Sequence, residues 1–175
     1  MTIAGKKGDP SVSNKEETNP TEKEIDKPLR VVGIGASAGG LEALEEFFRN
    51  IPVDTNLSFV VVQHLSPDYK SLMVELLSKY TDMEVTRADD GMPVEANNLT
   101  EQNQSHGLNL PIDIFLRSLA EDQKEKAIGV ILSGTGSDGT LGIRAVKGAG
   151  GIVFAQDNLS AKFDGMPRSA GSTGM

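Results

Sequence analysis

The sequence predicts an α/β protein with a doubly wound, mostly parallel sheet and helices on both faces. Short runs such as residues 57–62 are continuously apolar and rich in β-branched side chains, which is typical of strands that are buried on both faces. Segments with apolar residues at helical spacing separate these runs. Such an alternation of strands and helices indicates parallel strands that are covered by helices.

The predicted strands are short and apolar, and several of them lead directly into small or polar residues. In chain order they are residues 29–34, 57–62, 83–87, 127–132 and 151–155.

The predicted helices have one apolar side and one polar side. In chain order they are residues 41–49, 69–80, 111–123 and 140–148. Ser66 and Pro67 are typical of an N-cap and a first helical residue, and they predict the start of the second helix. Residues 88–110 are mostly polar and lack clear periodicity, so no element is assigned to them.

The chain of 175 residues is predicted to form one domain, residues 29–175, preceded by a disordered tail of residues 1–28. The tail is polar, charged and contains prolines but almost no apolar side chains. The absence of cysteine excludes disulfides, thiolate zinc sites and cysteine nucleophiles.

Charge and hydropathy narrow the range of partners. A net charge of −8 argues against nucleic acid as the main partner. No apolar stretch approaches the roughly 18 residues that span a bilayer, so no membrane insertion is expected. The first residues lead into no apolar segment of the kind that a signal peptide contains. A cytoplasmic location is therefore expected.

Ser37 follows a predicted apolar strand and is surrounded in the sequence by small residues. Residues 35–39, Gly-Ala-Ser-Ala-Gly, fit the G-x-S-x-G nucleophile elbow. A serine on a tight strand-to-helix turn needs small neighbours, and the turn presents the hydroxyl to substrate and the next main-chain N–H to an oxyanion. Small residues also serve close packing of a helix on a strand, so the motif alone leaves both interpretations open.

His64 and Asp138 follow the ends of two other predicted strands. Because the carboxyl ends of parallel strands meet at one edge of a sheet, Ser37, His64 and Asp138 are expected to lie together. His64 would accept the Ser37 proton, and Asp138 would orient the imidazole. Taken separately, His64 can be a polar residue at a strand end and Asp138 a cap for the helix that begins near residue 140. His106 lies in the aperiodic stretch and is the weaker candidate.

A nucleotide-binding interpretation uses the same first turn. Gly33, Gly35 and Ala38 fit the G-x-G-x-x-G/A fingerprint of dinucleotide-binding domains. The acidic residue that should close the second strand is absent, because Gln63 and His64 stand there. The sequence therefore disfavours this interpretation.

Several segments resemble the catalytic domain of CheB-type protein-glutamate methylesterases. They are GIGASAGG at residues 33–40, VQHL at 62–65, PIDIFLRSLA at 111–120, LSGTGSDGT at 132–140 and FDGMPR at 163–168. The resemblance extends from about residue 29 to the end of the chain. The residues GTGSD are similar to the CheB portion of CheB–CheR hybrid proteins.

The resemblance implies that Ser37, His64 and Asp138 form a catalytic triad. The implied reaction is hydrolysis of glutamate γ-methyl esters on methyl-accepting chemotaxis receptors, with deamidation of receptor glutamines as a related activity. By position, the Ala38 N–H is the expected oxyanion donor. The resemblance implies no metal or organic cofactor, and the hybrid proteins suggest a CheR-type methyltransferase domain as a partner.

The chain departs from the family pattern in several places. Residues 96–107 form a short polar bridge where the family has a further strand and a hairpin, so a parallel strand is expected to be missing. The chain is expected to be truncated at Met175, before a terminal helix, and to lack a receiver domain ahead of residue 29. These departures leave open a second hypothesis, a catalytically impaired module of the same fold that binds receptors or partners.

Overall fold

A computed structural model describes residues 29–64, 72–89, 91–102 and 110–174, and the structure below is that of these residues. Strands and helices alternate along most of the chain, as the hydrophobic pattern predicts, but β3 and β4 follow one another directly. In chain order they are β1 (Arg30–Ala36), α1 (Gly40–Arg49), β2 (Leu57–Gln63), α2 (Met73–Leu77), β3 (Glu84–Arg87), β4 (Asn98–Gln102), α3 (Pro111–Gln123), a 3-10 turn (Lys124–Lys126), β5 (Ala127–Ile131), α4 (Thr140–Gly148), β6 (Ile152–Ala155) and α5 (Gly165–Gly171).

The strands form one six-stranded sheet in the order β3-β4-β2-β1-β5-β6. Every neighbouring pair is parallel. The order reverses beside β1, which lies between β2 and β5. On one side β5 and β6 follow outward in chain order, whereas on the other side β3 forms the edge and β4 lies between β3 and β2. The α/β fold class is therefore confirmed, and the sheet of the described residues is entirely parallel.

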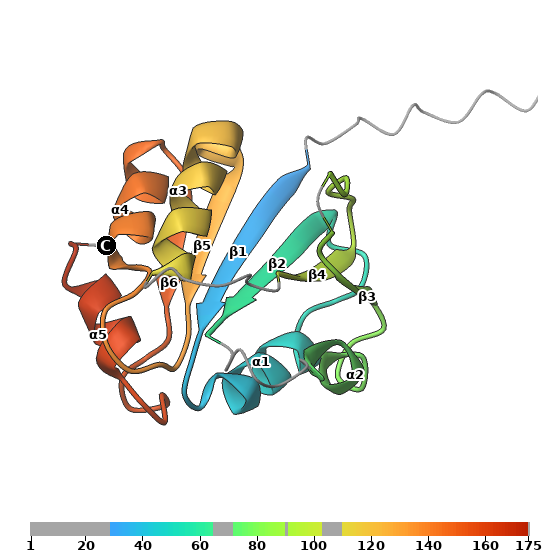
Figure 1. Ribbon diagram of the computed structural model, residues 1–175, viewed down its shortest axis with the longest axis horizontal. Helices are drawn as coiled ribbons and strands as arrows, with labels where there is room; N and C mark the ends of the chain where they lie inside the picture. Colours follow the sequence, from blue (N-terminus) through green and yellow to red (C-terminus); the bar gives the residue numbers. More distant parts are fainter. Residues whose placement is uncertain (1–28, 65–71, 90, 103–109, 175) are drawn as a thin grey trace, which may run out of the picture.

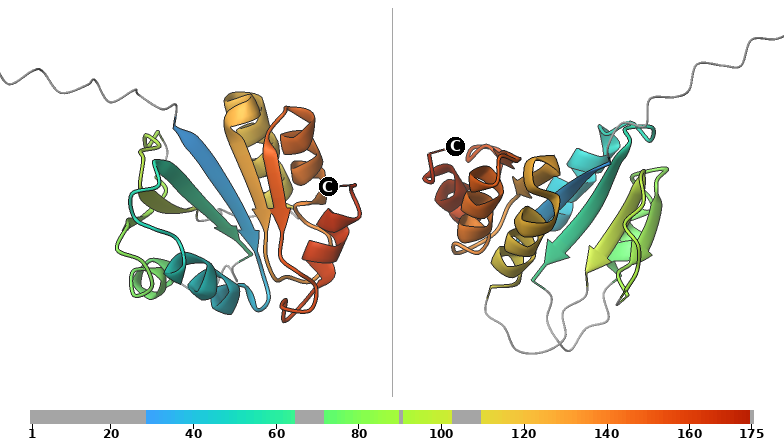
Figure 2. Two further views of the ribbon diagram at one scale, coloured as in Figure 1. Left: turned by 180° about the vertical axis from the view of Figure 1, so that it is seen from behind. Right: turned by 90° about the horizontal axis from the view of Figure 1, so that it is seen from above.

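Helices cover both faces of the sheet (Figures 1 and 2), and an apolar core lies between the sheet and the helices on each face. Side chains of α3, α4 and α5 fill one of them, with Ile112, Leu116 and Ile143 fully buried. Side chains of α1 and α2 fill the other, where Phe48 and Phe59 meet edge to face with ring centroids 5.5 Å apart. Successive residues of the central strands alternate between these cores, which explains why the strands are apolar without interruption.

Helix α3 packs directly against the backbone of β1 because β1 contains two glycines. A Cβ on Gly33 would lie 2.7 Å from the Phe115 ring, and one on Gly35 would collide with Ile112. The two glycines of the apparent dinucleotide fingerprint thus make room for α3. The close approach also brings the first turn of α3 near the carboxyl end of β1.

The polar stretch after residue 88 contains a strand that the sequence pattern does not predict. We expected a parallel strand to be missing here, and that expectation is wrong: β4 pairs with β2 on one side and with β3 on the other. Leu99 and Glu101 are fully buried in it. Main-chain pairing along both edges stabilises a strand whose composition is poor for a sheet, so tertiary context overrides propensity.

Other predicted elements differ at their ends. The predicted tail of residues 1–28, the N-cap at Ser66 and the first residues of the second predicted helix lie outside the described residues. Of that helix, the described part is α2, which is shorter than the pattern predicts. The sequence pattern also gave no sign of α5, whose GMPRSAG sequence is rich in small residues and contains a proline.

Candidate active site

Ser37 occupies a sharp turn between β1 and α1. Gly39 has a left-handed backbone with φ of 68°, a conformation that glycine adopts without strain, and α1 starts at the next residue. A Cβ on Gly39 would lie 2.8 Å from the Ser133 hydroxyl, so only glycine fits. The Ser37 N–H donates to the Ser133 carbonyl at 3.0 Å, which fixes the turn against the loop after β5.

His64 lies beside Ser37 because β1 and β2 end at the same level. Ala36 and Gln63 are the last paired residues of the two strands, and Ser37 and His64 follow them directly. Nδ1 of His64 lies 3.0 Å from the Ser37 hydroxyl oxygen. About one third of the His64 side chain is exposed (35%), so solvent reaches this part of the site.

Asp138 lies on the other side of the imidazole and is buried, with 3% of its side chain exposed. Its Oδ2 is 2.8 Å from Nε2 of His64. With the neutral imidazole protonated on Nε2, His64 donates to Asp138, and Nδ1 is free to accept the Ser37 hydroxyl proton. The structure thus brings together the three residues that the strand ends predict.

The N-terminus of α3 also contacts Asp138, which sequence reasoning missed. The helix begins with Pro111, which has no N–H, and the next two residues donate to the carboxylate: Ile112 to Oδ2 at 3.0 Å and Asp113 to Oδ1 at 2.9 Å. Oδ1 also accepts the Gly139 N–H at 2.8 Å. A negative charge at a helix N-terminus is stabilised by the unpaired N–H groups and the helix dipole.

A sequence signal for this contact exists. Helix α3 begins after Leu110, whose side chain cannot cap it, so its first N–H groups need an acceptor from elsewhere. From the sequence, the cap expected of Asp138 is one for the helix that follows it, not for α3.

These hydrogen bonds keep Asp138 ionised. Burial by itself raises the pKa of the Asp138 carboxyl, but the hydrogen bonds from His64 and from the N–H groups of Asp113 and Ile112 outweigh burial. The net effect is a pKa below the ordinary value for aspartate. At neutral pH the carboxylate is therefore charged and can stabilise a positive charge on His64.

Ser133, which is fully buried, connects three segments around the nucleophile turn. Its hydroxyl donates to the Ala38 carbonyl at 2.9 Å and accepts the Phe163 N–H at 3.0 Å. Its own carbonyl accepts the Ser37 N–H. Sequence reasoning missed this residue, because a serine in a glycine-rich loop gives no indication of which segments it will join.

An ion pair crosses the rim of the same turn. Lys162 lies against Gly39 and contacts Glu42 of α1, with Nζ 2.7 Å from Oε1. The hydrogen bond and charge of Lys162 lower the pKa of the Glu42 carboxyl, which is exposed. The pair joins α1 to the segment that precedes α5.

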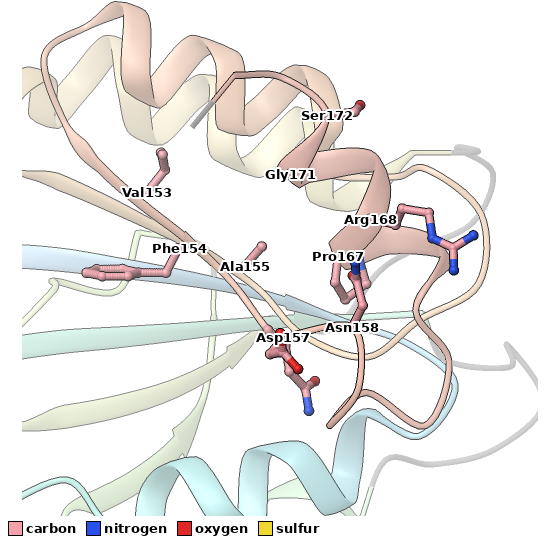
Figure 3. A pocket seen from close by; sticks show the side chains of 10 residues that line it. Val153, Phe154, Ala155, Asp157, Asn158, Pro167, Arg168, Gly171 and Ser172 are labelled. Atoms are coloured by element: carbon pink, nitrogen blue, oxygen red, sulfur yellow. The ribbon is translucent and has the colours of Figure 1, made fainter.

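An open groove of about 680 Å³ lies elsewhere, between the edge strand β6 and α5 (Figure 3). Its lining includes Phe154, Asp157 and Arg168, and none of the three residues at the strand ends. The chemistry and this groove are thus separate features, and we place the candidate active site at the strand ends because reactive groups converge there. In the part of the chain that the structure describes, no helix is long and apolar enough to cross a membrane.

The fold and the site together define a class of protein: a parallel α/β domain that carries a Ser–His–Asp series at the carboxyl edge of its sheet. The family model for the CheB methylesterase matches residues 32–175, and the chain belongs to this family. The crystal structure of the Thermotoga maritima CheB methylesterase catalytic domain superimposes with a TM-score of 0.77 at 29% identity, and the match covers 85% of this chain and 90% of that one.

Curated relatives give the same family. A protein of Pseudomonas fluorescens named protein-glutamate methylesterase/protein-glutamine glutaminase 1 is 31% identical over 163 residues, which are 82% of this chain and 48% of that protein. A Burkholderia orbicola protein named protein-glutamate methylesterase/protein-glutamine glutaminase 3 is 34% identical over 163 residues, which are 82% of this chain and 48% of that protein. The chain thus spans about half the length of the curated relatives that it matches.

Proposed function

We propose that this chain hydrolyses glutamate γ-methyl esters on chemotaxis receptors, with Ser37 as nucleophile, His64 as general base and Asp138 as the residue that orients the imidazole. The observation that carries the proposal is the continuous series of hydrogen bonds from the Ser37 hydroxyl through both ring nitrogens of His64 to a buried carboxylate. The names of the curated relatives support the same reaction.

In the first half of the reaction, Nδ1 of His64 takes the Ser37 proton while Oγ attacks the ester carbonyl. The Ala38 N–H follows the nucleophile directly and is the proposed donor to the oxyanion. Collapse of the tetrahedral intermediate breaks the bond to the methoxy group. His64 returns its proton to that group, so methanol leaves and an acyl-enzyme on Ser37 remains.

In the second half of the reaction, a water molecule takes the place of Ser37 as the nucleophile. His64 takes a proton from the water as it attacks the acyl carbon, and it then gives that proton to Oγ of Ser37. The products are the free glutamate side chain and the regenerated serine. With a glutamine substrate the same steps release ammonia in place of methanol, and we include this deamidation in the proposal.

The proposed partners are methyl-accepting receptors, with a CheR-type methyltransferase domain as a further partner, and the proposed location is the cytoplasm. The second hypothesis, a catalytically impaired module that binds receptors or partners, drew part of its support from the strand expected to be missing. Because β4 fills that position, this support is lost. The hydrogen-bonded series at the strand ends favours the enzyme.

Methanol release from methylated receptor membranes tests the proposal. The parent chain is compared with Ser37→Ala and with Ser78→Ala, which removes an exposed hydroxyl from the end of α2. Release by the parent and by Ser78→Ala, but not by a folded Ser37→Ala protein, is the expected result. Equal release by Ser37→Ala would exclude Ser37 as the nucleophile. No release by a cooperatively folded parent would favour the binding module.

A further inference from the structure

Helices α3 and α4 each begin without a capping side chain of their own. The N-cap positions are Leu110, whose side chain makes no bond to α3, and Gly139, which has no side chain to cap α4. The first N–H groups of a buried helix still need acceptors. Each helix receives one from a residue next to or within the other: Asp138 accepts from the start of α3, and Asp113 of α3 accepts the Gly142 N–H of α4 at 2.7 Å.

The two helices meet where this exchange occurs. Gly142 lies so close to α3 that a Cβ on it would be 2.5 Å from Cβ of Leu116 and 3.3 Å from Cα of Asp113. Asp113 itself is buried, with 4% exposed. A side chain held between two closely packed backbones has little freedom to move. The Asp113 carboxylate therefore fixes the first turn of α4, and the loop that carries Asp138, relative to the start of α3.

We propose that Asp113 is a positioning residue, which holds the Asp138 carboxylate in the orientation that faces His64 by joining the first turns of α3 and α4. Asp113 donates to Asp138 through its main-chain N–H and accepts from the Gly142 N–H through its side chain. One residue therefore holds both ends of the segment that runs from Asp138 to Gly142. The inference rests on the proposed function, because it assigns a role in the same Ser37–His64–Asp138 series.

Loss of the Asp113 side chain has a specific expected consequence. The Gly142 N–H loses its acceptor, and the first turn of α4 can move away from α3. A displacement of about 1 Å at a catalytic group can reduce a rate about 100-fold. Because Asp113 lies behind Asp138, we expect kcat to fall while KM changes little. Asparagine keeps a side-chain oxygen for the Gly142 N–H and should restore most of the function.

The experiment compares Asp113→Ala and Asp113→Asn with two controls. Asp122→Ala removes an exposed carboxylate from the far end of α3, and Val146→Ala weakens the buried side of α4 one turn beyond Gly142. Three quantities are measured on each folded protein: kcat and KM for methanol release, the proton NMR resonance of the His64 ring N–H that faces Asp138, and the exchange rate of the Gly142 amide.

For Asp113→Ala we expect a kcat lower by about 10- to 100-fold, faster Gly142 exchange and a ring N–H resonance that moves toward that of a free imidazole. Asp113→Asn and both controls should keep the parent resonance and a kcat within a few-fold of the parent. Asp113→Ala with faster Gly142 exchange but an unchanged resonance and kcat would overturn the inference, because Asp113 would then only cap α4.

The same data separate this inference from the proposed function. If the parent releases no methanol but shows the ring resonance, the proposed function fails, and the response of the resonance to Asp113→Ala still decides the positioning role. If the parent lacks a hydrogen-bonded ring resonance, the contact between His64 and Asp138 is absent in solution, and both proposals are contradicted.

Discussion

Ala36 and Gln63 are the last register partners of β1 and β2, and each is followed by a residue of the candidate site. Because the two parallel strands end at the same level, the Ser37 hydroxyl oxygen lies 3.0 Å from Nδ1 of His64, although 27 positions separate the two residues in the chain. The site is therefore a product of sheet register. Any change that shifts this register by one residue would turn one of the two side chains to the other face of the sheet.

Asp138→Asn should reduce kcat greatly without abolishing the activity. Asparagine cannot accept hydrogen bonds at both side-chain atoms, so the imidazole loses a partner of opposite charge and its preferred tautomer. In the Ser–His–Asp triad of the serine proteases, which have an unrelated fold, the corresponding substitution lowers kcat about 10⁴-fold. Single-turnover and steady-state methanol release would measure it. A rate equal to that of the parent would reduce Asp138 to a helix cap.

Asp138 should also make the fold sensitive to acid. Its pKa is lowered in the folded protein, so the folded state favours the charged form more than the unfolded chain does. The resulting stability is fully present above the unfolded pKa of about 3.9 and is lost as pH falls through the lower folded value. Urea unfolding at a series of pH values from 6 to 3 would measure this decline.

The matched comparison is Asp138→Asn against Glu42→Gln. The decline in unfolding free energy below about pH 4 should be smaller for Asp138→Asn than for the parent, because the titrating group is gone. Glu42→Gln should follow the parent closely, since an exposed ion pair is screened by solvent. Identical acid profiles for the parent and Asp138→Asn would show that Asp138 does not contribute.

Two glycines of α4 should respond in opposite directions to alanine. A Cβ on Gly142 would collide with Leu116, and overpacking of this kind typically destabilises by about 1–3 kcal/mol. A Cβ on Gly148 meets nothing within 4 Å, and alanine in a helix is favoured over glycine by about 0.5–1 kcal/mol. Thermal or urea unfolding of the two variants checks the pair. Equal effects would mean that α3 and α4 do not pack at Gly142.

Ser133→Ala should slow the reaction and destabilise the fold. The Ala38 carbonyl and the Phe163 N–H both lose the hydroxyl, and an unpaired buried polar group costs about 1–3 kcal/mol. The turn that carries Ser37 is then held less firmly, so kcat should fall more than KM rises. Ser58→Ala, at a buried serine near the opposite end of β2, is the control. Parallel losses of kcat in both variants would point to general destabilisation instead.

The strand ends could be predicted from the sequence because parallel topology alone places them at one edge. That reasoning needs only the order of apolar runs, and it is enough to select Ser37, His64 and Asp138 as neighbours. It does not provide the register, which depends on pairing between strands far apart in the chain. The orientation of the imidazole, with Nδ1 toward Ser37, likewise follows from atoms that a sequence pattern does not describe.

Other features escaped prediction for reasons that can be named. Strand β4 contains Asn98, Thr100 and Gln102, and only its place between two strands makes it a strand. The sequence predicts Asp138 as the partner of His64 or as a cap for the helix that follows it, whereas its carboxylate also accepts from α3, 25 residues earlier in the chain. Long-range acceptors of this kind are indicated only indirectly, by a helix that starts without a cap.

Asp138 both contacts His64 and accepts from the first turn of α3, and these two roles bear on whether a relative of this chain should be classified as an enzyme. A descendant that had given up the chemistry would still need an acceptor for the first turn of α3, so selection for the fold alone can preserve this aspartate. The Ser37 hydroxyl has a different standing, since within the described residues its recorded bond is the one to His64. When a divergent copy of this domain is classified as an enzyme or as a former enzyme, the serine is the more telling residue of the two.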